Sequence, residues 1–210
     1  MPPSIDRRRL ALLLIPFALS ALAGMLGTAL APSLLIHAPL VLVALSPLGR
    51  HLLLASPQIE ALPFFAVAVP RMFAVDPFMY LLGRDYGELA LAELTARLGG
   101  AGRVVLWLDR AARRGSWLLV LLWPDPLVCT LAGVSRLHPV LFVVLNLVGT
   151  VGALTLVRLS GDALAGPLGW VRNFLADNML TTTAVSALVV LVVASLRWAA
   201  QRTPGEEPIE

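Results

Sequence analysis

The chain has 210 residues, of which 58% are hydrophobic and 14% are charged, whereas soluble domains contain roughly 45–50% apolar residues. A water-soluble globular domain is excluded, because so few charged residues cannot cover so much apolar surface. The net charge of +3 comes from 16 arginines and no lysine, and these lie mostly outside the apolar runs. Their placement predicts a membrane protein and no nucleic-acid partner.

Cysteine and histidine usage excludes two further classes of protein. Cys129 is the single cysteine and the three histidines are scattered, so neither a disulfide framework nor a zinc site can be assembled from local spacing. We expect no metal and no cofactor. The chain also carries no G-x-S-x-G, no H-E-x-x-H and no P-loop, so we expect no enzyme activity, and an intramembrane enzyme is a distant third hypothesis.

The first apolar run, Leu10–Ala31, follows three arginines and contains Ala21-Leu22-Ala23, which could serve as a signal-peptide cleavage site. Cleaved apolar regions span about 7–15 residues, and this run is longer, so we favour an uncleaved first membrane span. Two further spans are predicted without interruption, at His138–Leu159 and Thr182–Trp198.

A fourth span, Glu60–Gly83, contains three prolines together with Arg71 and Asp76. Proline removes a helix hydrogen bond, and ionisable residues at membrane depth need neighbours that pair with them. The pattern predicts a kinked helix shielded by the rest of the protein. Two interpretations of Arg71 and Asp76 are equally favoured: a role in function, or an ion pair that only stabilises the fold.

Two apolar stretches, Pro32–Pro57 and Ser116–Arg136, are interrupted by prolines and glycine near their middles. Irregular backbone at membrane depth is tolerated where it is buried in protein or lines a wet cavity. Paired broken segments in two halves of a chain are typical of inverted-repeat transporters. We therefore predict an all-α membrane protein with four spans and two opposed re-entrant hairpins.

Arginine distribution predicts the orientation in the membrane. Basic residues concentrate in cytoplasmic loops, and the loops assigned to one side hold most of the arginines. Only Arg50 and Arg172 are assigned to the other side. This places both termini and the middle segment in the cytoplasm. The cytoplasmic set is Arg7, Arg8, Arg9, Arg84, Arg97, Arg103, Arg110, Arg113, Arg114, Arg136, Arg197 and Arg202.

Two amphipathic helices are predicted between the halves, at Asp85–Leu98 and Arg103–Arg114. The second repeats basic and aromatic residues on one face, which would lie on anionic lipid headgroups. A solvated face that follows the positive-inside rule is the favoured alternative. The face consists of Arg103, Trp107, Arg110 and Arg114. The segment after residue 202 contains two prolines and three glutamates and no apolar run, and it is predicted to be disordered.

Three further residues each have two possible roles, one functional and one structural. Arg84 follows Gly83, and its guanidinium either binds a lipid phosphate or anchors the helix end. The two roles are about equally favoured, because Arg84 also belongs to the sequence motif described next. Asp125 lies between two prolines, and capping the following half-helix is favoured over holding a cation or proton. Asn146 lies within a span, where a bond to a neighbouring helix is favoured over substrate contact.

The spacing of Asp76, Tyr80, Gly83, Arg84 and Gly87 resembles a signature of the DedA family, the bacterial relatives of the VTT (SNARE-associated Golgi protein) domain. Downstream residues resemble the family's second signature, in which a broken hairpin leads into a span. These are Ala132, Gly133, Phe142, Asn146 and Gly149. The resemblance covers roughly residues 32–159.

The resemblance implies two re-entrant hairpins that face each other and transport of lipids or of polyprenyl phosphate, often dependent on the proton gradient. The chain departs from the family at two places. It has no acidic residue between Pro32 and Gln58, where many members have two, and it lacks two arginines that flank a proline in the second hairpin. The family's proton-coupling carboxylates and anion site are therefore not carried over.

The resulting hypothesis is a multi-pass bacterial inner-membrane transporter for lipid or polyprenyl phosphate. Its pathway would use Arg71, Asp76, Tyr80, Gly83, Arg84, Gly87, Asp125 and Asn146. The alternative is a scaffold that recruits lipids or a partner without transporting anything. The predicted regions are a first span in 1–31, a core in 32–159, an external loop and last span in 160–201, and a cytoplasmic tail in 202–210.

Overall fold

The computed structural model describes residues 7–98 and 115–202, and it contains helices and no β-strand within these two ranges. Four stretches are long and apolar enough to cross a membrane; they correspond to the four predicted spans and suggest a multi-pass membrane protein. They are Arg8–Ala29, Ala61–Gly87, Pro139–Ala163 and Met179–Arg197. The first belongs to α1 (Arg7–Ala29), the third is α9 (Pro139–Ala163), and the last belongs to α11 (Met179–Arg202).

The second span consists of two helices, α5 (Ala61–Phe73) and α6 (Asp76–Leu98), separated by a turn at residues 74–75. The break lies just before Asp76-Pro77, because the proline ring fits the first turn of a helix and not its interior. The predicted kink is therefore present. Helix α6 continues to Leu98, so the helix predicted separately at Asp85–Leu98 is an extension of this span.

Both broken stretches contain a helix, a break and a second helix. In the first, α2 (Ala31–His37) precedes α3 (Pro39–Leu45), and residues 46–48 separate α3 from α4 (Gly49–Ala55) and the 3-10 turn η1 (Ser56–Gln58). In the second, a helical segment at 115–122 is separated by residues 123–125 from α8 (Pro126–Val134). Prolines at each break lack the N–H that a continuous helix needs.

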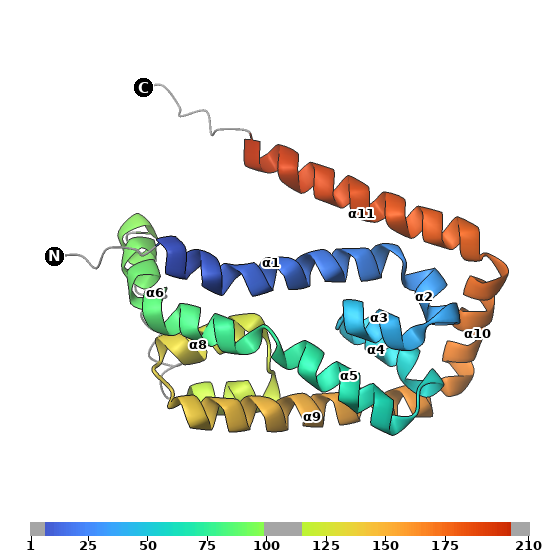
Figure 1. Ribbon diagram of the computed structural model, residues 1–210, viewed down its shortest axis with the longest axis horizontal. Coiled ribbons are helices and arrows are strands. Elements are labelled where there is room, and N and C mark those ends of the chain that lie inside the picture. Colours follow the sequence, from blue (N-terminus) through green and yellow to red (C-terminus); the bar gives the residue numbers. More distant parts are fainter. Residues whose placement is uncertain (1–6, 99–114, 203–210) are drawn as a thin grey trace.

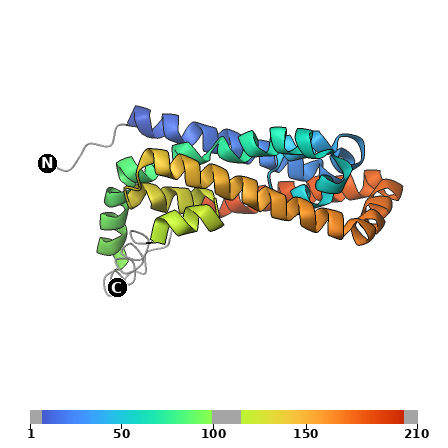
Figure 2. The ribbon, with the colours of Figure 1, turned by 90° about the horizontal axis from the view of Figure 1, so that it is seen from below.

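Helix α9 runs along the length of the molecule, from beside α8 at one end to α10 (Ala165–Asp177) at the other (Figures 1 and 2). Helix α10 crosses the ends of α9 and α11 and has no buried residue, so the predicted external loop is largely a surface helix. The described ends of α1, α6 and α11 at residues 7, 98 and 202 lie toward the opposite end (Figure 1).

Each broken stretch has its own apolar core. One core joins α2, α3, α4 and α5 and contains the fully buried Phe64. The other joins α6, α8 and segment 115–122 around Phe142 of α9. Because Leu154 of α9 belongs to the first core and Phe142 to the second, α9 connects the two.

Candidate functional site

The two helix breaks meet at one cavity, which residues of α1, α5 and α6 also line. Pro47 and Leu48 of the first break line it together with Pro124 and Asp125 of the second. This central cavity measures about 260 Å³. An adjoining cavity of about 310 Å³ shares three of these four residues. The central cavity is therefore formed jointly by the two halves of the chain.

Arg71 lies in the wall of the central cavity and binds the end of α3. Its Nε donates to the carbonyl of Ala44 at 2.6 Å, and Nη2 donates to the carbonyl of Leu45 at 3.1 Å. Nη1 donates to the hydroxyl of Ser20 on α1 at 2.9 Å. The last carbonyls of a helix lack intrahelical partners, so Arg71 satisfies them and joins α1 to the first break. Arg71 and Asp76, both described residues, do not pair with each other; each binds other partners.

Asp76 lies in the same wall and is 3% exposed. Its Oδ2 accepts a hydrogen bond of 2.9 Å from Nδ2 of Asn146 on α9. The same amide donates to Sγ of Cys129 at 3.2 Å, and the Thr150 hydroxyl approaches the Asn146 carbonyl oxygen at 3.4 Å. The favoured prediction for Asn146 was a hydrogen bond to a neighbouring helix. Asn146 makes this bond to Asp76 of α6, whose carboxylate lines the central cavity.

Asp125 caps α8. Its backbone is extended, and its Oδ1 accepts from the backbone N–H of Leu127 at 2.9 Å, which is the geometry of an N-cap. The favoured prediction for Asp125 is thus confirmed. Because the same residue also lines both cavities, a second carboxylate faces the region of Asp76 and Arg71.

Tyr80 and Arg84 lie one turn apart on α6, away from the central cavity. The Tyr80 hydroxyl donates to the carbonyl of Leu137, just before α9, and its ring stacks on Phe142 with centroids 4.3 Å apart. Nη1 of Arg84 donates to the Tyr80 oxygen at 3.1 Å, and Arg84 is exposed. Tyr80 fastens the second broken stretch, and Arg84 remains available at the surface.

Glycines of the resemblance motif bring α6 and α8 into close contact. A Cβ added to Gly83 would lie less than 3.0 Å from the carbonyl of Thr130, and one added to Gly133 would meet the backbone of Tyr80 and Arg84. Gly87 packs against the side chain of Val134. Small residues four apart allow two helix backbones to approach in membranes. The structure assigns Gly83 and Gly87 to packing and does not bring them into the cavity.

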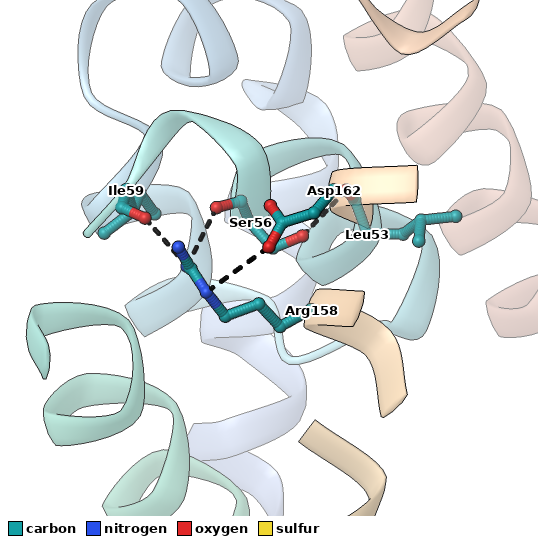
Figure 3. Close-up of polar contacts among 5 residues, drawn as sticks. All are labelled: Leu53, Ser56, Ile59, Arg158 and Asp162. Carbon is teal, nitrogen blue, oxygen red and sulfur yellow. Dashed lines mark hydrogen bonds and ion pairs between the residues drawn. The ribbon is translucent and has the colours of Figure 1, made fainter. Parts of the chain in front are cut away.

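Arg158 of α9 is not among the site residues predicted from the sequence. Its Nη1 donates to the carbonyls of Ser56 at 3.1 Å and Ile59 at 2.8 Å, and Nε lies 3.8 Å from Oδ2 of Asp162 (Figure 3). The guanidinium carbon also lies 5.8 Å from the ring centroid of Phe64. The signal was present, because an arginine within an apolar span is the same feature that singled out Arg71.

Contacts at the two ends of the molecule are reciprocal. Tyr80 of the second span binds Leu137, the residue before the N-cap of α9, and Arg158 of α9 binds Ile59, the residue before the N-cap of α5. A Cβ on Gly83 would meet α8, and one on Gly161 would meet Leu53 of α4 and Ser56. Each span therefore fastens the broken stretch of the other half.

We expect removal of the Arg158 guanidinium to loosen the first broken stretch. Arg158→Met leaves the carbonyls of Ser56 and Ile59 without this donor, which should lower the free energy of unfolding by about 2 kcal/mol. Thermal unfolding in detergent measures the change. Arg172→Met, at an exposed position of α10, should leave the midpoint unchanged. Equal midpoints for both variants would contradict the role given to Arg158.

The predicted headgroup face of Arg103, Trp107, Arg110 and Arg114 lies outside the described residues, as does the tail from residue 203. Among the described residues, Arg9 of α1 forms an ion pair of 2.8 Å with Asp85 of α6. Comparisons of the chain with family models, curated proteins and solved structures found no match. The site's own geometry therefore carries the functional argument.

Proposed function

We propose that the chain is a divergent DedA-type transporter that moves a lipid or a polyprenyl phosphate between the leaflets of a bacterial inner membrane. The observation that carries the proposal is the meeting of two helix breaks, one from each half, at a cavity that also contains Arg71 and Asp76. Broken helices at membrane depth expose backbone polar groups that can receive a polar substrate group.

A repeat in the chain supports this arrangement. The starts of α5 and α9 are 78 residues apart, and the same offset separates Phe64 from Phe142 and Tyr80 from Arg158. The spans α5–α6 and α9 run in opposite directions along the molecule (Figure 1). Equivalent elements in opposite directions are what an inverted repeat requires. The two broken stretches are then re-entrant hairpins that enter from opposite faces.

The proposed orientation places both termini in the cytoplasm. The described ends of α1 and α11 lie toward the same end of the molecule as the Arg9–Asp85 ion pair (Figure 1). Described arginines at these helix ends include Arg8, Arg9 and Arg197, as the positive-inside rule requires of a cytoplasmic face. The first hairpin would then enter from the outer face and the second from the cytoplasm.

The residues have different roles in this proposal. Asp76 and Asp125 provide carboxylates in the central cavity that hold a proton or cation during passive or ion-coupled movement. Arg71 positions the first break, since its donors are bound to backbone carbonyls and Ser20. Arg84, exposed beside Tyr80, meets the phosphate where it leaves the cytoplasmic side. The headgroup moves through the cavity while the acyl chains stay in lipid.

Reconstitution tests the proposal. Liposomes that contain the purified protein, a fluorescent phospholipid or a labelled polyprenyl phosphate, and an impermeant quencher report transbilayer movement. We expect movement well above that of empty liposomes, and loss of it in Asp76→Asn, which keeps the shape and one acceptor oxygen. Asp177→Asn, on exposed α10, is the matched control. No movement of either lipid by folded, inserted protein would reject the proposal.

A scaffold without transport is the second candidate, and one observation favours it. The polar groups of the site largely satisfy one another, as in the Asp76–Asn146–Cys129 cluster and the bonds of Arg71. In a scaffold, the hairpins would be packing devices and the basic surface would recruit lipids or a partner. Such a protein would tolerate Asp76→Asn in cells, whereas a transporter would lose activity while still folding and inserting.

A further inference from the structure

A groove separates much of α1 from α11. It measures about 750 Å³ and is lined mostly by apolar and small residues, including Met25, Val189 and Val193. The two helices diverge from each other toward residue 202 (Figure 1). Near their other ends, the Ser186 hydroxyl of α11 donates to the carbonyl of Thr28 at 2.7 Å. The two helices are thus joined near one end and diverge toward the other.

The charged residues of this groove all have one sign. Arg50, at the start of α4, and Arg197, near the end of α11, line it, and no Asp or Glu is among its described lining residues. Both arginines are exposed. A neighbouring cavity of about 370 Å³ shares Arg50 and adds His51. The central cavity, by contrast, contains two carboxylates.

The groove also adjoins the central cavity. Both are lined by Ser20, Ala21, Pro47 and Leu48, so the tip of the first hairpin forms a wall common to the two. An amphiphile in the groove would therefore have its headgroup beside the first helix break. Arg50 lies two residues from Leu48, on the same tip.

We infer that the α1–α11 groove binds a membrane lipid with an anionic phosphate headgroup. Arg50 holds the phosphate at the hairpin tip, Arg197 holds anionic headgroups near the end of α11, and the hydrocarbon chain lies along Met25, Val189 and Val193. A guanidinium suits a phosphate through paired hydrogen bonds, and the apolar walls suit acyl chains better than free phosphate. This inference deepens the proposed function and rests on it only for the suggestion that the lipid continues into the central cavity.

Lipid binding to the purified protein tests the groove directly. The protein is exchanged into detergent with phosphatidylglycerol or phosphatidylcholine of the same acyl chains, and the bound lipid is counted by native mass spectrometry. We expect the wild type to retain the anionic lipid preferentially. Arg50→Gln should weaken this binding about fivefold, as expected for one basic contact with an anionic lipid, whereas Arg172→Gln should not change it.

A second pair of variants tests the groove by volume. Gly24 lines the groove, and a Cβ added there has no atom within 4 Å. Gly24→Leu should therefore fold and fill the groove, which lowers lipid retention. Gly152→Leu, at an equally open glycine of α9 outside the groove, is the control. Thermal unfolding verifies that both variants are folded.

Specific outcomes would overturn the inference. These are equal retention of the two lipids, unchanged binding in both Arg50→Gln and Gly24→Leu, or competition of inorganic phosphate as strong as that of lipid. A change of oligomeric state in Gly24→Leu without a change in lipid retention would assign the groove to a second copy of the chain and would also overturn it. Selective binding without transbilayer movement would keep the groove and reject transport, which separates the two proposals.

Discussion

Replacing Gly133 by alanine should lower the thermal unfolding midpoint of the protein by roughly 5–10 °C. The added Cβ would lie less than 3.0 Å from the Tyr80 carbonyl and 2.7 Å from the Arg84 backbone nitrogen. Both atoms are backbone, so no flexible side chain can move away, and α6 and α8 must separate. Separation also weakens the contacts of Tyr80 with Phe142 and Leu137.

The matched control is Gly152→Ala on α9, where an added Cβ meets nothing within 4 Å. Alanine favours a helix over glycine by up to about 1 kcal/mol, so this variant should be equal to or more stable than the wild type. Gly83→Ala should resemble Gly133→Ala, and the double variant should cost less than the two changes added together, because one separation relieves both clashes. A wild-type midpoint for Gly133→Ala would refute the close α6–α8 contact.

Replacing Arg71 by methionine should cost more than about 3 kcal/mol of unfolding free energy, because several charged hydrogen bonds are lost and their acceptors stay behind. The carbonyls of Ala44 and Leu45 and the hydroxyl of Ser20 would lose their donor. We expect α3 and the first break to become mobile. Hydrogen exchange of the backbone amides should increase most in residues 39–48.

Arg71→Lys separates charge from geometry. Lysine keeps the positive charge, but its single ammonium cannot reproduce the planar fork that binds Ala44, Leu45 and Ser20 together. We therefore expect only partial recovery of stability. Arg172→Met, an exposed arginine replaced in the same way, should have no effect. Full stability in Arg71→Lys would show that charge alone suffices and would contradict the bonding described for Arg71.

The spans and the helix breaks were predictable from sequence because they depend on local properties. Apolar length determines whether a helix can cross a membrane, and proline removes a helix donor wherever it occurs. The positions of Pro47 and Pro124 therefore located both breaks. The cap formed by Asp125 was also predictable, since an extended residue before a half-helix needs a side-chain acceptor.

Contacts between distant segments were not predictable in the same way. Nothing in the neighbourhood of Arg71 shows that it binds α3 and α1, since its partners lie 26 to 51 residues away. The bond from Arg158 to Ile59 spans 99 residues. Helix α10 was expected as a loop because its glycines, proline and polar residues contain no clean apolar run. The 78-residue offset became visible once the reciprocal contacts were known.

Thiol accessibility at the two breaks tests the central claim, that both halves form one water-reachable cavity at membrane depth. Cys129, the single cysteine, is buried, so the wild type is the unreactive reference. Leu48→Cys places a thiol at the first break in the central cavity, and Trp123→Cys places one at the second break in the adjoining cavity. Val144→Cys places one on an exposed face of α9. A membrane-impermeant, charged thiol reagent is applied to protein in lipid bilayers.

We predict that Leu48→Cys and Trp123→Cys react at least about tenfold faster than Val144→Cys. The thiolate is the reactive form, and a thiol ionises only where water reaches it. Protection of both break positions at the level of Val144→Cys would mean that the breaks are dry packing devices. That result would contradict the shared cavity and leave the scaffold as the better account of this protein.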